Sequence, residues 1–460
     1  MSTSKTKQIA LLAGPILALL IGYLMHRSGF SADAAIALGV TVICVVWWIF
    51  EPIPIPATSL LPLALLPLLG VVTPQRVGQA YGNPLILLLL GGFILSTALE
   101  RNGAHRRIAL TMVRAFGGNS SRRLVFGFMA ASALLSMWIS NTATTLMLLP
   151  VALAVLEKAE DPKLATPLLL GIAYAASVGG IATPIGTPPN VVFMGIFNEL
   201  GQEQMGFASW MSFALPIVLV FLPIVALWLT RGLRHQGTVE LPTVGPWQAG
   251  EVRVLVVFAA TALLWITRSE PFGGWTAWLG LDRTNDAMVA LLAVVVMFVV
   301  PDGKGERLLD WETAARIPWG MLILFGAGLT IAAAFTSSGL SQTIGDALTG
   351  LAVLPVFVIM ATICFAVTFL TETTSNTATT TLLMPILAAG ALGAGMDPKL
   401  LMIPATISAS CAFMLPVATA PNVIMFSTGR FSIKTMAKEG FALNLIGALI
   451  ISSMCYMFLA

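Results

Sequence analysis

From Leu124 to Leu156 the chain runs for 33 residues without a charged side chain, yet a polar phrase interrupts this apolar stretch. The phrase begins SNTATT at Ser140, and it returns at 375–380 inside a second apolar region. Over eleven residues, the two copies agree at eight positions. A single group of hydroxyl and amide side chains is ordinarily explained by packing between membrane helices. Two near-identical copies indicate that the chain builds the same polar feature twice.

The composition explains the apolar surroundings of the phrase. Of the 460 residues, 57% are hydrophobic and only 10% are charged, and the mean hydropathy is +0.91. A soluble chain typically carries about 25% charged residues. The sequence therefore predicts an all-α polytopic membrane protein, which we expect in the cell inner (plasma) membrane.

Other compositional signals are weaker. Lys5 and Lys7 precede an apolar run as in a signal peptide, but no A-x-A-like cleavage site follows, so we expect an uncleaved first span. The net charge is +3 and the basic residues are scattered between apolar segments, which predicts no nucleic-acid partner. The four cysteines lack metal-type spacing and are interpreted as packing residues.

Eleven apolar segments are interpreted as simple transmembrane spans. They lie at about 8–25, 32–50, 55–73, 84–100, 164–185, 207–230, 252–268, 285–301, 319–337, 398–418 and 438–459. Two further apolar regions, 124–156 and 352–390, contain the repeated phrase.

The length of region 124–156 favours a re-entrant helical hairpin. One spanning helix needs about 20 residues and two need about 40. Divided into two arms, the region gives helices that rise only about 24 Å each, less than the roughly 30 Å of a hydrocarbon layer. A hairpin with Ser140 at its tip fits this length, and we expect a second hairpin at 352–390.

The distribution of charge agrees with two hairpins. With the N-terminus in the cytoplasm, 19 of the 24 Lys and Arg residues lie on the cytoplasmic side, as the positive-inside rule requires. The external residues are Arg27, Arg76, Arg268, Arg283 and Lys399. A single span through 124–156 would move Arg231, Arg234 and Arg253 outside. The sequence therefore predicts a cytoplasmic N-terminus and an external C-terminus.

The number of spans between the two hairpins predicts an inverted repeat. Five simple spans separate the two hairpins, so the second hairpin enters from the opposite face. GTPPN at 186–190 follows the first hairpin and ATAPN at 418–422 follows the second. Inverted repeats with interrupted helices are typical of secondary transporters, whose site lies near the membrane midplane.

The repeated phrase suits an anion and a small cation. Ser, Asn and Thr are good N-cap residues, so Ser140, Asn141 and Thr142 should begin the second arm with free N–H groups, which favour an anion. Backbone carbonyl and hydroxyl oxygens in the same loops are ligands for a cation such as sodium. The prolines of GTPPN and ATAPN should break their helices and supply further carbonyls.

These features resemble the divalent anion/sodium symporter family. The paired SNT phrases and the pattern S-x-x-F-x-x-P-V-A-x-x-x-N from Ser410 to Asn422 carry the resemblance, which covers essentially the whole chain. The resemblance implies one sodium site formed by Ser136, Ser140, Asn141 and Gly186, and another formed by Thr371, Thr374, Asn376 and Ala418. It also implies substrate contacts from Ser140, Asn141, Thr142, Ser375, Asn376 and Thr377, flanked by Thr187, Pro188 and Thr419. Ala420 stands where the first loop has Pro188, so the two loops differ there.

The family also implies a domain plan with eleven spans, two hairpins and a homodimer that works by an elevator motion. Residues 1–118 would form scaffold helices 1–4 with a cytoplasmic surface helix. Residues 119–230 would form the first transport half, 231–351 the scaffold helices 7–9, and 352–460 the second transport half. His105 falls on the expected surface helix, where we expect a solvated or interfacial position.

The favoured function is sodium-coupled import of a four-carbon dicarboxylate such as succinate, with no organic cofactor. Two similar tips suit a molecule with a carboxylate at each end, and no third polar cluster or basic residue near the phrases would receive a third carboxylate. A sodium-independent exchanger and a sodium/sulfate symporter remain as alternatives. An enzyme is not expected, because His26, His105 and His235 are dispersed and no H-E-x-x-H or G-x-S-x-G occurs. Glu372 either has a functional role or organises the second tip.

Overall fold

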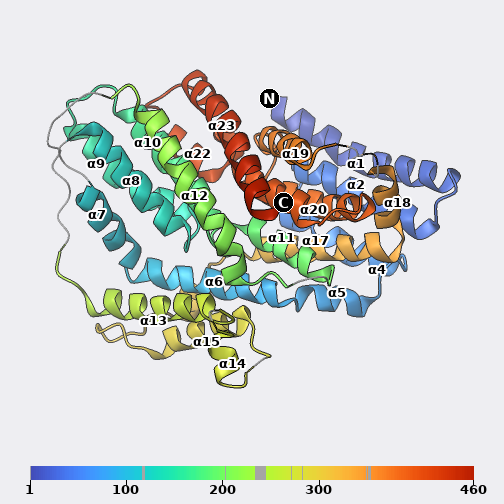
Figure 1. Ribbon diagram of the computed structural model, residues 1–460, viewed down its shortest axis with the longest axis horizontal. Helices are drawn as coiled ribbons and strands as arrows, with labels where there is room; N and C mark the ends of the chain where they lie inside the picture. The colour runs from blue at the N-terminus through green and yellow to red at the C-terminus, as the bar shows by residue number, and fades with distance from the viewer. Residues whose placement is uncertain are drawn as a thin grey trace.

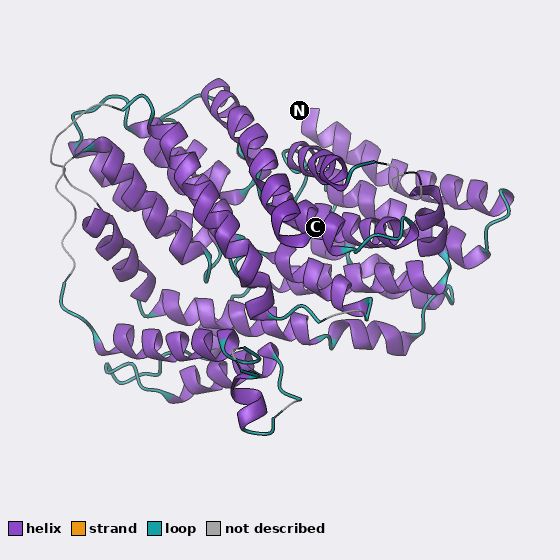
Figure 2. Ribbon diagram, viewed as in Figure 1, coloured by secondary structure: helices purple, strands orange, loops and turns teal. Residues whose placement is uncertain are grey.

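The computed structural model describes residues 2–116, 120–201, 204–233, 245–270, 272–281, 283–348, 350 and 354–460. Over these residues the chain is helical and contains no β-strand, only an isolated bridge between Pro301 and Arg307. Figure 2 shows helices joined by loops throughout. The prediction of an all-α chain is confirmed. Arg234, His235 and the domain boundaries expected at 118–119 and 351–352 lie outside the described residues.

Each of the eleven segments expected to span the membrane contains helix. The helices are α1 (Ser2–Arg27), α2 (Ala32–Phe50), α3 (Ile55–Thr58) with α4 (Leu60–Leu68), α6 (Pro84–Arg101), α10 (Ala165–Gly180), α12 (Phe207–Thr230), α13 (Ala249–Ile266), α15 (Asp286–Val299), α17 (Trp319–Ser337), α21 (Lys399–Ala409) and α23 (Ile433–Leu459). Among the described residues, seven helical stretches are long and apolar enough to cross a membrane, while α3–α4, α10, α15 and α21 are shorter apolar helices.

Two of these helices end before the segments predicted from the sequence. Segment 164–185 was expected to be one span, but α10 ends at Gly180, and segment 398–418 contains a helix that ends at Ala409. The GTPPN and ATAPN sequences that follow carry prolines, which supply no N–H to continue a helical ladder. The chain then resumes as α11 (Pro188–Glu199) and, after a short 3-10 turn η2 (Pro416–Ala418), as α22 (Ala420–Phe426).

Two consecutive helices joined by a short turn occupy each region of the repeated phrase, and each pair keeps the name hairpin below, while its re-entrant course in a membrane stays a prediction. The first consists of α8 (Ser121–Ser136) and α9 (Asn141–Lys158), and the second of α19 (Val356–Leu370) and α20 (Asn376–Gly393). Each hairpin is followed by a broken helix and then by a long helix, α12 or α23 (Figure 1). The order of elements is therefore repeated, as the two copies of the phrase indicate.

The first repeat, α8 to α12, packs against the second repeat, α19 to α23, through the broken helices. The second half of each broken helix packs on the hairpin of the other repeat, so that α11 contacts α20 and α22 contacts α9. Aromatic rings join the repeats as well, because the Tyr174 ring of α10 lies 4.8 Å from that of Phe413 and the Phe221 ring of α12 lies 6.0 Å from it. This packing brings the two tips to one region of the molecule.

Short helices connect and flank these elements. They are α5 (Pro74–Tyr81), α7 (Ala104–Phe116), α14 (Gly274–Trp278), α16 (Trp311–Ala314) and α18 (Leu340–Leu348). Helix α7 joins α6 to the first hairpin, and its buried Arg107 pairs with Glu251 at the start of α13, with 2.7 Å between Nε and Oε2. The Arg107 guanidinium also donates to the carbonyls of Gly245 and Pro246. These bonds fix α7 against α13.

Candidate functional site

The first tip, residues 136–140, runs from the last residue of α8 to the residue before α9. Ser140 has extended backbone angles and its hydroxyl accepts a hydrogen bond from the Ala143 N–H at 3.1 Å, which makes Ser140 the N-cap of α9. The N-cap predicted for this phrase is confirmed. The N–H groups of the first turn have no intrahelical acceptor, so the start of α9 favours negative charge.

The second tip, residues 371–375, has the same backbone plan with different side-chain bonds. Ser375 is the N-cap of α20 but its side chain makes no capping hydrogen bond. The Thr374 hydroxyl instead lies 2.6 Å from the Thr379 hydroxyl. The Ser375 hydroxyl is therefore available to a ligand at the start of α20.

Each tip contains a hydroxyl bonded to an amide five residues further on. In the first tip, the Ser136 hydroxyl donates to Asn141 Oδ1. In the second, the Thr371 hydroxyl donates to Asn376 Oδ1 at 2.7 Å. Both hydroxyl-bearing residues are fully buried. An amide oxygen has two lone pairs, so one remains on each asparagine, together with two N–H donors.

Glycines allow oxygen atoms to crowd together beside the first tip. A Cβ on Gly186 would lie 3.0 Å from the Ser136 carbonyl oxygen. A Cβ on Gly180 would lie 2.8 Å from Asn141 Oδ1 and 3.1 Å from the Gly186 carbonyl oxygen. Carbonyl, amide and hydroxyl oxygens are hard ligands for a small cation. The donor set around Gly186 therefore fits sodium.

At each helix break, the side chain of a buried asparagine binds backbone carbonyls that have left the helix. The Asn190 side-chain amide donates to the carbonyls of Gly180, Ile181 and Thr183 at 2.8–3.2 Å. The Asn422 amide donates to the carbonyls of Ala412 and Leu415 at 3.0 and 3.1 Å. These are carbonyls that the break removes from the helical ladder, and within a bilayer they need a partner in the protein.

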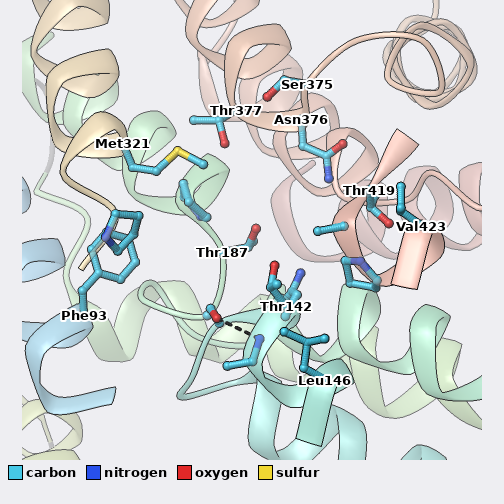
Figure 3. A pocket seen from close by; sticks show the side chains of 18 of the residues that line it. Phe93, Thr142, Leu146, Thr187, Met321, Ser375, Asn376, Thr377, Thr419 and Val423 are labelled. Carbon is cyan, nitrogen blue, oxygen red and sulfur yellow. Dashed lines mark hydrogen bonds between the residues drawn. The ribbon is translucent and has the colours of Figure 1, made fainter. Parts of the chain in front are cut away.

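The two tips and the two breaks line one cavity of about 1090 Å³. All nine residues predicted to contact substrate line it, namely Ser140, Asn141, Thr142, Thr187, Pro188, Ser375, Asn376, Thr377 and Thr419. Figure 3 shows Ser375, Asn376 and Thr377 along one side of this cavity, Thr142 on another, and Thr187 between Thr142 and Thr377. The structure therefore brings the predicted substrate residues together.

The residues predicted to bind sodium are divided between the cavity wall and the layer behind it. Ser140, Asn141, Gly186, Thr374, Asn376 and Ala418 line the cavity. Ser136 and Thr371 are buried and reach the site through their bonds to Asn141 and Asn376. Within the described residues, no group of three or more His, Cys, Asp or Glu residues could hold a metal ion. The residues predicted to bind sodium offer only neutral oxygen atoms.

Titratable side chains also line the cavity wall, which the sequence did not predict. Glu51, Glu100, His105 and Arg316 contribute to it. The exposed Arg316 guanidinium donates to Glu312 at 2.7 Å, so its charge is already compensated. His105 is half-buried, its Nδ1 lies 3.1 Å from the Leu99 carbonyl, and desolvation lowers its pKa below the ordinary value. Basic residues are thus present in the cavity although none belongs to the tips.

The sequence did not predict that the side chains of Asn190, Asn422 and Tyr174 hold the two helix breaks through hydrogen bonds. The Tyr174 hydroxyl donates to the Phe413 carbonyl at 2.6 Å, across a separation of 239 residues. The repetition of T-x-P-N in both loops was a signal for the two asparagines. No local pattern marks Tyr174.

Comparison with known proteins agrees with this architecture. A family model described as the sodium:sulfate symporter transmembrane region matches residues 5–459. The sodium-dependent dicarboxylate transporter SdcS of Staphylococcus saprophyticus is 38% identical, and that of Staphylococcus aureus strain RF122 is 40% identical. Each alignment covers 97% of this chain and 90% of the relative.

Two solved structures share the fold. The YdaH transporter of Alcanivorax borkumensis matches with a TM-score of 0.59 at 17% identity, covering 85% of this chain and 87% of that one. The MtrF efflux pump of Neisseria gonorrhoeae matches with a TM-score of 0.60 at 15% identity, covering 86% and 84%. Together with the family match along nearly its whole length, the paired phrases and tips identify this chain as a member of the sodium:sulfate symporter family, the divalent anion/sodium symporters.

Proposed function

We propose that this protein imports four-carbon dicarboxylates, with succinate as the representative substrate, and couples their entry to sodium. The observation that carries the proposal is the meeting of two polar tips, one from each repeat, in one cavity. The names of the relatives, sodium-dependent dicarboxylate transporters, support both the substrate class and the coupling ion.

A dicarboxylate matches the two tips because it carries one anionic group at each end. The beginnings of α9 and α20 each offer free backbone N–H groups, the positive end of a helix dipole and hydroxyl donors. Ser140, Asn141 and Thr142 would receive one carboxylate, and Ser375, Asn376 and Thr377 the other. Thr187, Pro188 and Thr419 would complete the wall.

Sodium supplies the charge that the tips lack. No Lys or Arg belongs to either phrase, and a dianion buried without a counter-charge would be strongly destabilised. Sodium ions at Ser136, Ser140, Asn141 and Gly186, and at Thr371, Thr374, Asn376 and Ala418, would provide it. Because the tips share asparagines between ion and substrate, binding of one would favour binding of the other.

The proposed membrane arrangement has eleven spans and two re-entrant hairpins in an inverted repeat, with the N-terminus in the cytoplasm and the C-terminus outside. Glu51, Glu100, His105 and Arg316 come from chain segments that the charge distribution assigns to the cytoplasm. The cavity would then open inward. Residues 1–118 and 231–351 would form the scaffold, and 119–230 and 352–460 the moving part of an elevator within a homodimer.

Competition for sodium-driven succinate uptake into liposomes tests the substrate class. Malate and fumarate should compete well, because each presents two separated carboxylates. Citrate and sulfate should compete poorly, because citrate adds a third carboxylate and sulfate places its charge on one centre. Strong inhibition by sulfate with weak inhibition by malate and fumarate would instead identify a sodium/sulfate symporter.

A further inference from the structure

Glu372 is the only acid in region 352–390, and its side chain is 3% exposed. Four N–H donors converge on its carboxylate. Oε1 accepts from the backbone N–H of Phe413 at 2.7 Å, from that of Met414 at 2.8 Å and from Asn444 Nδ2 at 2.7 Å. Oε2 accepts from the backbone N–H of Leu415 at 2.9 Å. A single carboxylate thus holds three successive backbone amides.

These amides belong to the break between α21 and η2, where no helical acceptor is available to them. The carbonyls of the same segment are held by other side chains. Tyr174 donates to the Phe413 carbonyl, and Asn422 donates to the carbonyls of Ala412 and Leu415. Peptide units in the break are therefore fixed at both their N–H and C=O ends.

Glu372 also belongs to the second tip. It follows Thr371, whose one hydroxyl proton is shared between two acceptors, Asn376 Oδ1 at 2.7 Å and, at 2.9 Å, the Ala409 carbonyl at the end of α21. The segment that Glu372 holds leads directly into Ala418 and Thr419, which line the cavity. The carboxylate therefore joins the tip to the break, the two parts that together form the proposed second sodium site.

The first repeat makes the corresponding connection without a charge. The offset of 235 residues between Ser140 and Ser375 places Met137 at the position of Glu372. There the Met137 backbone carbonyl accepts a hydrogen bond from the Thr183 hydroxyl of the first break. One neutral bond in the first repeat thus corresponds to four bonds to a carboxylate in the second, and bonds to charged groups are individually stronger.

Glu372 is not part of the cavity wall and holds the site from behind it. Three of the four N–H groups bind Oε1 and one binds Oε2, so both oxygens are engaged by the protein. Among the described residues that form the cavity wall, Glu372 does not appear, whereas its neighbours Thr373 and Thr374 do. Its effect on the site must therefore pass through the backbone that it holds.

We propose that Glu372 is the positioning residue of the second sodium site, fixing the distance between the second tip and the second break. This inference rests on the proposed sodium coupling. Without the carboxylate, the backbone amides of residues 413–415 lose their acceptor. The segment that leads to Ala418 is then no longer fixed relative to Thr371 and Asn376, the other ligands of the site. The first site, which is held by Thr183 and Asn190, stays intact.

The test measures sodium dependence in the full-length protein carrying Glu372→Gln. This substitution keeps the shape of the side chain but turns an N–H donor toward backbone N–H groups. The sodium concentration for half-maximal succinate uptake in liposomes should rise at least about tenfold. In detergent without succinate, the sodium-dependent rise in melting temperature should require correspondingly more sodium.

Glu439→Gln is the matched control. Glu439, on α23, accepts hydrogen bonds from Trp228 Nε1 at 2.9 Å and from the Arg231 guanidinium at 2.8 Å. It forms no bond to the tips or the break, although the adjacent Gly440 packs against Phe413. Its loss should leave the half-saturating sodium concentration at the wild-type value. Asn444→Ala removes one hydrogen bond to the Glu372 carboxylate, and Tyr174→Phe removes one to the Phe413 carbonyl. Each should raise the sodium requirement as Glu372→Gln does, by a smaller factor.

The outcomes separate this inference from the proposed function. Sodium-independent behaviour of the wild-type protein would overturn the function itself. A sodium-dependent wild type, with the wild-type sodium requirement retained in Glu372→Gln and in both milder variants, would overturn only the role of Glu372. A lower melting temperature with an unchanged sodium requirement would do the same, because it would mark a purely structural residue. If Glu372→Gln yields no folded protein, the two milder variants decide.

Discussion

Asn141 and Asn376 each accept a hydrogen bond from a buried hydroxyl and keep one oxygen lone pair and two N–H donors for ligands. We predict that Asn141→Ala or Asn376→Ala weakens sodium and succinate binding together, each by about tenfold or more, because both ligands use the same side chain. Titration of purified protein with each ligand, in the presence and absence of the other, measures this. Lost succinate affinity with intact sodium affinity would show that the two sites are not shared.

Gly186 leaves room for the oxygen atoms of the proposed first sodium site. A Cβ at this position would lie 2.5 Å from the Gly180 carbonyl oxygen and 3.0 Å from that of Ser136, so the oxygen cluster proposed for the first sodium site would have to shift. Gly186→Ala should therefore raise the sodium concentration needed for uptake. Gly78→Ala is the control, because a Cβ there meets nothing within 4 Å and its helical backbone suits alanine. Equal sodium requirements in the two variants would contradict the proposed site.

A buried ion pair holds helix α7 against α13, and its loss should destabilise the protein. Arg107 is 8% exposed and bonds to Glu251, and its guanidinium lies 4.5 Å from the centroid of the Trp247 ring. Arg107→Gln leaves Glu251 buried without its partner, so we expect a loss of about 3–5 kcal/mol in stability. Arg76→Gln breaks the more exposed pair with Glu199 and should cost about 0–1 kcal/mol. Melting temperatures in detergent compare the two, and equal losses would contradict this role of the pair.

Two helices joined by a turn at each phrase were predictable from the sequence, whereas their packing was not, and their re-entrant course stays a prediction. The lack of charge from Leu124 to Leu156 limits the chain to two arms that are too short to span, and the N-cap at Ser140 follows from residue type. The nine residues predicted to bind substrate were found through the repeated phrase, and their role in binding stays a prediction. The contacts of α11 with α20 and of α22 with α9 join segments far apart in the chain, so no local pattern encodes them.

At the scale of the whole molecule, the two interlocked repeats present their tips to one cavity, which predicts a requirement for the dianion. Protonation of one carboxylate forfeits a charge-assisted hydrogen bond, which contributes about 1.5–3 kcal/mol. Succinate uptake at fixed total concentration should therefore fall with the dianion fraction as the pH is lowered from about 8 toward the carboxyl pKa range. Uptake that follows the monoanion fraction would contradict recognition at both ends.

Replacement of sodium shows directly whether sodium drives succinate uptake. Purified protein in liposomes is supplied with labelled succinate and an inward gradient of sodium, or with potassium or choline at the same ionic strength. Because the tips carry no basic residue, succinate uptake should collapse in potassium and in choline and should be restored by sodium. Undiminished uptake without sodium, driven by succinate on the other side of the membrane, would contradict sodium coupling and identify an exchanger.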